Sequence, residues 1–159
     1  MTRFKNEHAE IIKSIIGESL LGINGLIYWL EEPDLIHPQQ IQFTFSRAQT
    51  KISFRCGMDG STLEFTDIEM QESDLGEYGR EVIMNISYTP HFQQYLGQVL
   101  SGFFAIYSAT ENSIIGMKLC FKNQINLIIL NTGDEISIFD SLSLQYEKEE
   151  RITYIDVTI

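Results

Sequence analysis

Cysteine, proline and long apolar runs are scarce in this sequence. It holds two cysteines and three prolines among 159 residues, and no apolar run approaches the roughly 20 residues that a membrane-spanning helix needs. The first ten residues mix charges and lack the apolar region of a secretory signal. Each cysteine lies within a strand-like apolar run, which is typical of a free thiol that packs as a small hydrophobe. These absences predict a soluble cytoplasmic protein.

Basic residues are also scarce. Eleven Lys and Arg residues oppose 22 Asp and Glu residues, which gives a formal net charge of -11 at pH 7. A uniformly acidic surface repels nucleic acids and anionic membranes, so we expect neither as a partner, whereas it would steer a basic protein toward the chain. Solubility alone explains the same charge. With 43% hydrophobic and 11% aromatic residues, the composition is that of one compact domain over residues 1–159.

The common motifs of catalysis and phosphate binding are missing. Neither G-x-S-x-G nor a P-loop occurs, and the glycines of IIGESLLG (15–22) and YLGQVLSG (95–102) are spaced G-x4-G, unlike a dinucleotide-binding loop. Those glycines are better explained as residues that end a helix and begin a strand. The histidines, His8, His37 and His91, show no metal-ligand spacing. We therefore expect no enzymatic activity, no cofactor and no metal.

Hydrophobic periodicity predicts one helix followed mostly by strands. Apolar residues recur at helical spacing over 4–16, and Gly17 is a plausible stop. A short helix is expected after Pro90. Period-two alternation predicts strands in both halves of the chain, at 26–31, 41–45, 51–56, 61–70, 80–88, 103–109, 116–121, 125–130, 135–139 and 151–159. The predicted fold class is α+β, predominantly antiparallel β.

The two halves of the chain resemble each other. The paired glycines of 15–22 recur 80 residues later, the strand IQFTF matches MKLCF, the turn GMDG matches NTGD, and an arginine precedes the last strand of each half. Loop trimming shortens such a spacing while matching strands are kept. The order of these segments predicts an internal repeat, 11–88 and 91–159. We expect two similar five-strand units, packed about a pseudo-twofold axis.

Asp59 and Asp134 occupy the two matching turns, and Asp67 and Asp140 lie at roughly matching strand ends. Paired carboxylates serve acid/base chemistry or Ca²⁺ binding. Asp is also common in turns because its side chain bonds the local backbone. We interpret these residues as turn formers.

Acidic residues concentrate before the last strand of each half. A solvated loop is one explanation, and a docking surface for a basic protein is the other, with two tyrosines as aromatic anchors inside an acidic rim. The candidate partner-binding residues are Glu69, Glu72, Asp74, Glu77, Tyr78, Tyr146, Glu147, Glu149 and Glu150.

In its size, acidity, strand-rich alternation and lack of catalytic residues, the chain resembles the small acidic α+β proteins of bacteria that accompany toxins as immunity proteins or antitoxins. The resemblance is general and rests on no family-specific motif. It implies a non-catalytic protein that binds a partner toxin, often a basic one, and occludes its active site.

A different class of function is also compatible with the sequence. A small-molecule-binding module or an enzyme would place its pocket between the two half-units, where Tyr28, Trp29 and Tyr107 could line it. The oligomeric state is open at this point.

Overall fold

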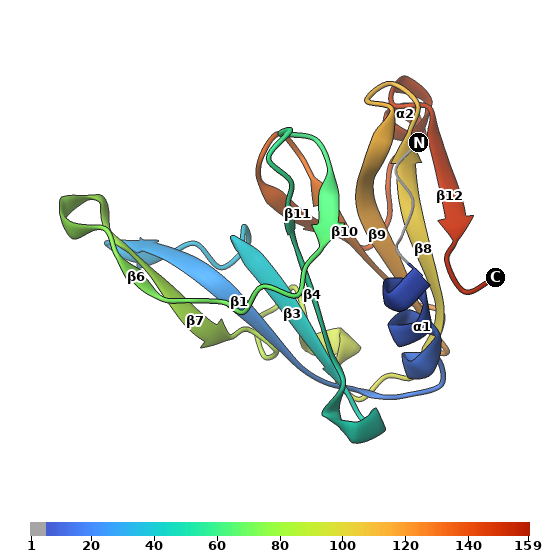
Figure 1. Cartoon of the computed structure of the whole chain (residues 1–159), viewed down its shortest axis with the longest axis horizontal. Helices are drawn as coiled ribbons and strands as arrows, with labels where there is room; N and C mark the ends of the chain where they lie inside the picture. Colours follow the sequence, from blue (N-terminus) through green and yellow to red (C-terminus); the bar gives the residue numbers. More distant parts are fainter. Residues whose placement is uncertain (1–5) are drawn as a thin grey trace.

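Two antiparallel β-sheets dominate the protein, and helices are few (Figure 1). The computed structural model describes residues 6–159, with side chains from residue 8 onward. Every strand pairing in it is antiparallel, which confirms the predicted strand class. Within the described residues, the helices are too short and too polar to cross a membrane.

The N-terminal helix α1 (Asn6–Ile15) confirms the predicted helix, although residues 4 and 5 of that prediction lie outside the described range. Its buried side chains, Ile12 and Ile15, lie three residues apart and therefore share one face of the helix. His8 stacks on Phe65 with ring centroids 4.1 Å apart. These contacts dock α1 on the core.

The first sheet has the strand order β5-β4-β3-β1-β7-β6, and the short β2 pairs with the end of β1. It therefore has seven strands, and the predicted five is wrong. The two extra strands lie in segments for which no strand was predicted, where they form two-residue pairings on the ends of longer strands. The strands are β1 (Leu20–Leu30), β2 (Glu32–Pro33), β3 (Gln40–Phe45), β4 (Lys51–Cys56), β5 (Leu63–Phe65), β6 (Ser73–Asp74) and β7 (Arg80–Asn85).

The second sheet has the five expected strands, in the order β11-β10-β9-β8-β12. A short helix, α2, precedes its last strand and was not predicted. The segment after Pro90 forms only a 3-10 turn, Gln93–Tyr95. The elements are β8 (Leu100–Ser108), β9 (Ser113–Phe121), β10 (Asn126–Asn131), β11 (Ile136–Phe139), α2 (Leu144–Glu149) and β12 (Ile152–Asp156).

The two sheets share a strand order and are joined by reciprocal backbone bonds. Apart from the two-residue strands β2 and β6, each sheet has four strands that form a meander and a last strand that returns beside the first. The Gly17 N–H donates to Leu100 O at 2.8 Å, and the Gly97 N–H donates to Leu20 O at 2.8 Å. Each of these bonds joins a residue of one half to the other half. The common origin of the halves stays a prediction.

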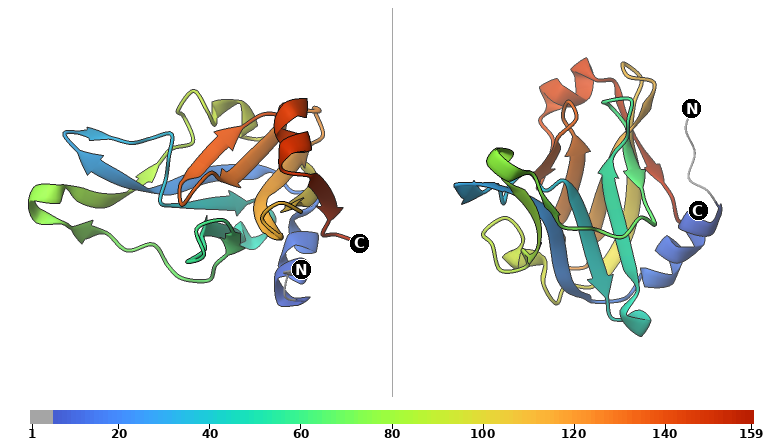
Figure 2. Two further views of the ribbon diagram at one scale, coloured as in Figure 1. Left: turned by 90° about the horizontal axis from the view of Figure 1, so that it is seen from above. Right: turned by 60° about the vertical axis from the view of Figure 1, so that its left-hand side comes forward.

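The core lies where the inner faces of the sheets meet (Figure 2). Phe54 of β4 and Phe103 of β8 stack across it with centroids 6.1 Å apart. The boundary between the two halves at the edge of this core is called the seam. A hydrogen bond crosses it directly, from Asn131 Nδ2 to Thr62 O at 3.0 Å. The end of β1, together with β6 and β7, extends past the second sheet on the left of Figure 1. The structure thus has a packed body and a projecting end.

Candidate functional site

The β2–β3 loop is held rigidly against β1 by its two ends. The Asp34 N–H donates to Tyr28 O at 2.9 Å, and the Gln39 N–H donates to Leu26 O at 2.7 Å. Between these bonds Pro38 is buried. Because proline fixes its own φ and restricts the residue before it, the loop has little freedom around residue 37.

The β10–β11 turn faces this loop from the second sheet. Asn131 Oδ1 accepts hydrogen bonds from Gly133 N at 3.1 Å and from Asp134 N at 2.7 Å, and Thr132 N donates to Glu135 O at 2.8 Å. Gly133 and Asp134 take φ values of 93° and 63°. Asp134 N also donates to Gly60 O at 3.2 Å, so the turns at 57–60 and 131–134, which the sequence comparison matched, contact each other.

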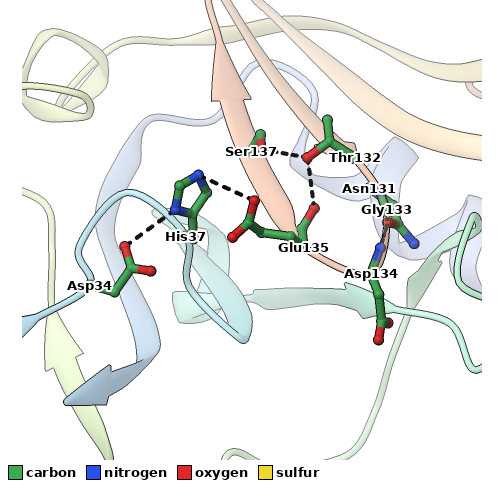
Figure 3. A network of polar contacts seen from close by, with 8 residues as sticks. All are labelled: Asp34, His37, Asn131, Thr132, Gly133, Asp134, Glu135 and Ser137. Carbon is green, nitrogen blue, oxygen red and sulfur yellow. Dashed lines mark hydrogen bonds and ion pairs between the residues drawn. The ribbon is translucent and has the colours of Figure 1, made fainter. Parts of the chain in front are cut away.

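These two segments bring a histidine between two carboxylates (Figure 3). His37 Nδ1 lies 3.3 Å from Asp34 Oδ1, and His37 Nε2 lies 3.5 Å from Glu135 Oε2. One donor atom from each residue can be chosen so that all three lie within 4.8 Å of one another. The side chains of His37, Asp34 and Glu135 are 28%, 39% and 50% exposed. This seam triad (Asp34, His37, Glu135) contains the ligand types that bind divalent cations.

A small pocket of about 190 Å³ adjoins the triad. Its cysteine, Cys56, has a pKa raised to about 12 by burial and then by the negative charges of Asp134, Glu135 and Glu64. A thiol with such a pKa stays protonated near neutrality and is a poor nucleophile. The lining residues are Pro38, Gln39, Arg55, Cys56, Asp134, Glu135 and Ile136.

A larger groove of about 470 Å³ lies between the halves, and polar and apolar surface line it in nearly equal parts. Burial raises the pKa of Tyr146, and the charges of Glu150 and Glu111 raise it further, so an acidic pair lies near this phenol. The hydrogen bond from the Thr62 side chain, followed by two backbone bonds, lowers the pKa of Asp59. The lining residues are Asp59, Gly60, Ser61, Glu111, Ile115, Asn131, Thr132, Gly133, Tyr146 and Glu150.

The first acidic cluster lies on the acidic segment, residues 69–81, which leads to the projecting end. Glu72 accepts from Ile83 N at 2.9 Å and Asp74 accepts from Gly76 N at 2.8 Å, so both carboxylates hold the local backbone. Glu69 and Glu77 are exposed and make no hydrogen bond or ion pair with residues 8–159. Tyr78 is 69% exposed.

The second acidic cluster surrounds α2 and is divided between several contacts. Tyr146 and Glu150 line the groove. Glu147 accepts from the Tyr154 hydroxyl at 2.6 Å, and Glu149 accepts from a side-chain amide one turn earlier. In Figure 1, α2 and the β6–β7 end lie on opposite sides of the molecule. The structure therefore does not join the two clusters into one surface.

Of the predicted aromatic pocket residues, Tyr28 and Trp29 lie on β1 and Tyr107 lies on β8. The Tyr28 hydroxyl donates to Tyr78 O, and the Arg80 guanidinium lies 4.9 Å from the Trp29 ring centroid. The Tyr107 hydroxyl donates to an asparagine oxygen at 2.6 Å. None of Tyr28, Trp29 and Tyr107 lines either cavity described above.

Sequence reasoning missed the seam triad. Asp34 stands three residues before His37, a spacing that could have been noticed, but Glu135 lies 98 residues further along the chain. Only the packing of one sheet against the other brings it close.

Comparison with known proteins assigns no family. No protein-family description, curated protein or solved structure matches this chain. Its function has to be inferred from the chemistry of its own residues.

Proposed function

We propose that the protein is a non-catalytic binding protein that docks a basic partner protein on its acidic segment, residues 69–81. The observation that carries this proposal is the exposure of apolar side chains among free carboxylates at a projecting end. Leu75 is 41% exposed and Tyr78 is 69% exposed; Glu77 lies between them in the sequence and Glu69 lies six residues before Leu75. Exposed aromatic anchors within a charged rim are typical of protein-binding surfaces.

The charges around the acidic segment support a basic partner. Arg80 is its only basic residue, and its guanidinium stacks on Trp29. The net charge of -11 adds a long-range negative field, which accelerates the approach of a positively charged protein.

Among roles that require docking of a basic protein, neutralisation of a toxin fits the acidic segment best. Immunity proteins and antitoxins act in this way. A binding surface on a projecting end can enter the active site of a partner while the packed body stays unchanged. This proposal expects a neighbouring gene whose basic product arrests growth when it is expressed without this protein. A genomic neighbourhood without such a gene would contradict the toxin-neutralising role.

The binding test compares two double charge reversals. We expect E69K/E77K to slow association with that gene product by about tenfold at low salt, because steering adds 10- to 1,000-fold to association rates. The control E10K/D140K reverses two exposed acids elsewhere and makes the same change in formal charge, from -11 to -7. Stopped-flow measurement of the association rates of both variants shows whether the effect depends on the acidic segment or on net charge alone. Equal slowing by the two variants, or none by E69K/E77K, would exclude the acidic segment as the docking surface.

A small-molecule-binding function is the second candidate, and the groove between the halves favours it. Its volume of about 470 Å³ is in the range of ligand sites, while its lining with Glu111 and Glu150 beside Tyr146 suits a cationic ligand such as a polyamine. Calorimetric titration with spermidine tests this. The E111Q/E150Q variant should lose the binding that E69K/E77K keeps; no heat with the unsubstituted protein would remove the candidate.

We also propose that the two units arose by internal duplication and pack about a pseudo-twofold axis. The shared strand order and the reciprocal bonds of Gly17 and Gly97 support this. The isolated bridge between Ser19 and Val99, which are 80 residues apart, adds support because residues at equal repeat positions face each other there.

A further inference from the structure

We propose that the seam triad binds a divalent cation of the first transition row, with Zn²⁺ as the best fit, and that this cation ties the two sheets together. The proposal is independent of the docking function. It rests on the spacing of the three side chains, the rigidity of the segments that carry them, and the chemistry of the donors.

The three side chains lie close enough to share a cation once the carboxylates rotate. In the structure they contact different ring nitrogens of His37, at 3.3 Å for Nδ1 and 3.5 Å for Nε2, so a cation has to draw them to the same nitrogen. Ligands at about 2.0–2.2 Å from a tetrahedral Zn²⁺ are separated by roughly 3.4 Å. Rotation of the half-exposed Glu135 and Asp34 side chains can bring both carboxylates to one ring nitrogen of His37, because the three donor atoms already lie within 4.8 Å.

The two segments are fixed before any ligand arrives. The β2–β3 loop is bonded to β1 at Asp34 and at Gln39, and Asn131 bonds the β10–β11 turn from within. Because the backbone is already fixed, binding restricts only the side-chain rotations of these residues. Since the two segments belong to different sheets, a cation held between them would link the sheets.

The donor set selects the kind of cation. An imidazole nitrogen suits Zn²⁺ and its neighbours in the first transition row, whereas Mg²⁺ and Ca²⁺ prefer sites made of oxygen alone. Two carboxylates balance the charge of a divalent ion. Among residues 8–159, no Lys or Arg lies within 4.0 Å of the Asp34 or Glu135 carboxylate, and Arg55 in the adjoining pocket is paired with Glu64 at 2.7 Å.

Zinc titration of the tag-free protein by calorimetry tests the proposal, with H37Q as the decisive variant. We expect one site, which Mg²⁺ and Ca²⁺ fill at least about tenfold more weakly. H37Q should weaken Zn²⁺ binding by at least tenfold, because loss of even an outer-shell partner costs about 10–100-fold in metal affinity. The control H91Q removes an exposed histidine outside the triad and should bind as the unsubstituted protein does.

Further variants separate this site from other sources of binding. E135Q should repeat the loss seen in H37Q, while C56S and E69K/E77K should keep Zn²⁺ affinity. Zinc at a hundredfold excess over its Kd should raise Tm by about 5–10 °C in the unsubstituted protein and not in H37Q. Circular dichroism establishes that each variant is folded. Retention of Zn²⁺ affinity in both H37Q and E135Q, or its loss in C56S alone, would overturn the proposal.

Discussion

Gly17 lies in the linker that leads into β1, and Gly97 lies in the linker that leads into β8. Replacement of each of these glycines, the first of its G-x4-G pair, by alanine should reveal whether the two linkers are equivalent. Gly17 and Gly97 take φ values of 89° and 77°, and a Cβ built on either would meet no atom within 4 Å. Alanine is therefore disfavoured at both by backbone conformation alone. The second glycines, Gly22 and Gly102, have no positive φ, and a Cβ there would make only ordinary contacts, at 3.7 Å and 3.4 Å.

Two opposed effects set the change in the free energy of unfolding. An L-residue in the left-handed region costs about 1–2 kcal/mol. Replacement of glycine by alanine also restricts the unfolded chain, which stabilises the folded protein by roughly 0.4–1 kcal/mol and offsets part of that cost. We expect G17A and G97A each to lower the free energy of unfolding by about 1 kcal/mol, which is a Tm decrease of about 2–4 °C at this chain length. G22A and G102A keep only the second term, so they should leave stability unchanged or raise it by up to about 1 kcal/mol.

Urea unfolding followed by circular dichroism measures all four variants, with stability compared at constant m-value. A difference of more than about 1 kcal/mol between G17A and G97A would refute the equivalence of the two linkers. A loss in G22A as large as that in G17A would show that the loss does not come from the backbone conformation.

Three further substitutions examine the core, a buried phenol and the pocket thiol. G116A should lower the free energy of unfolding by about 1–3 kcal/mol in a thermal melt, because the added Cβ would lie 2.5 Å from Ile129 O. Y95F should cost about 1 kcal/mol in urea unfolding, since it removes the 2.6 Å bond from the buried phenol to Asn126 O. The raised pKa of Cys56, about 12, means that its thiol is still protonated when the unfolded chain ionises near pH 8.5. Stability should therefore fall as pH rises from about 8.5 toward 12, and C56S should reduce that decline in alkaline urea titrations. Alkylation of folded Cys56 at pH 9 should be at least about tenfold slower than in the unfolded chain; equal rates would contradict the shift.

Much of the fold could be predicted because long alternating segments carry their own signal. IQFTF at 41–45 and EISIF at 135–139 become β3 and β11, each with a boundary change of one residue. The predicted strand 61–70 shows where alternation misleads, since β5 ends at Phe65. Phe65 pairs with Phe54, and beyond it only the Thr66 N–H still donates to β4, to Ser53 O at 2.9 Å. From residue 69 onward the predicted strand would also pass the end of β4 at Lys51 and have no partner there.

Other features depend on contacts that no local pattern encodes. Helix α2 is only six residues long, and its one local signal is Ser143, whose Oγ accepts from Tyr146 N at 3.1 Å. The pairing of β6 with β7 involves only Ser73 and Asp74, too short for periodicity to register. The seam triad depends on the placement of Glu135 against a loop of the other half, which the packing of the sheets alone decides.

The shared strand order indicates which segments the sheets require. The second sheet joins its first two long strands through the short turn at 109–112, while the first sheet makes the same antiparallel pairing through 31–39. The longer connection is therefore not needed for that pairing, and it is the one that carries Asp34 and His37. Most of the acidic segment likewise belongs to a connection, 66–79, whose short strand β6 forms a projecting hairpin with β7. Both proposed binding regions thus fall largely on connections between the strands that the two sheets have in common. Because Glu69 and Glu77 are exposed and His37 is a partly exposed loop residue, these side chains contribute little to the core, and their substitution should change binding without unfolding the protein.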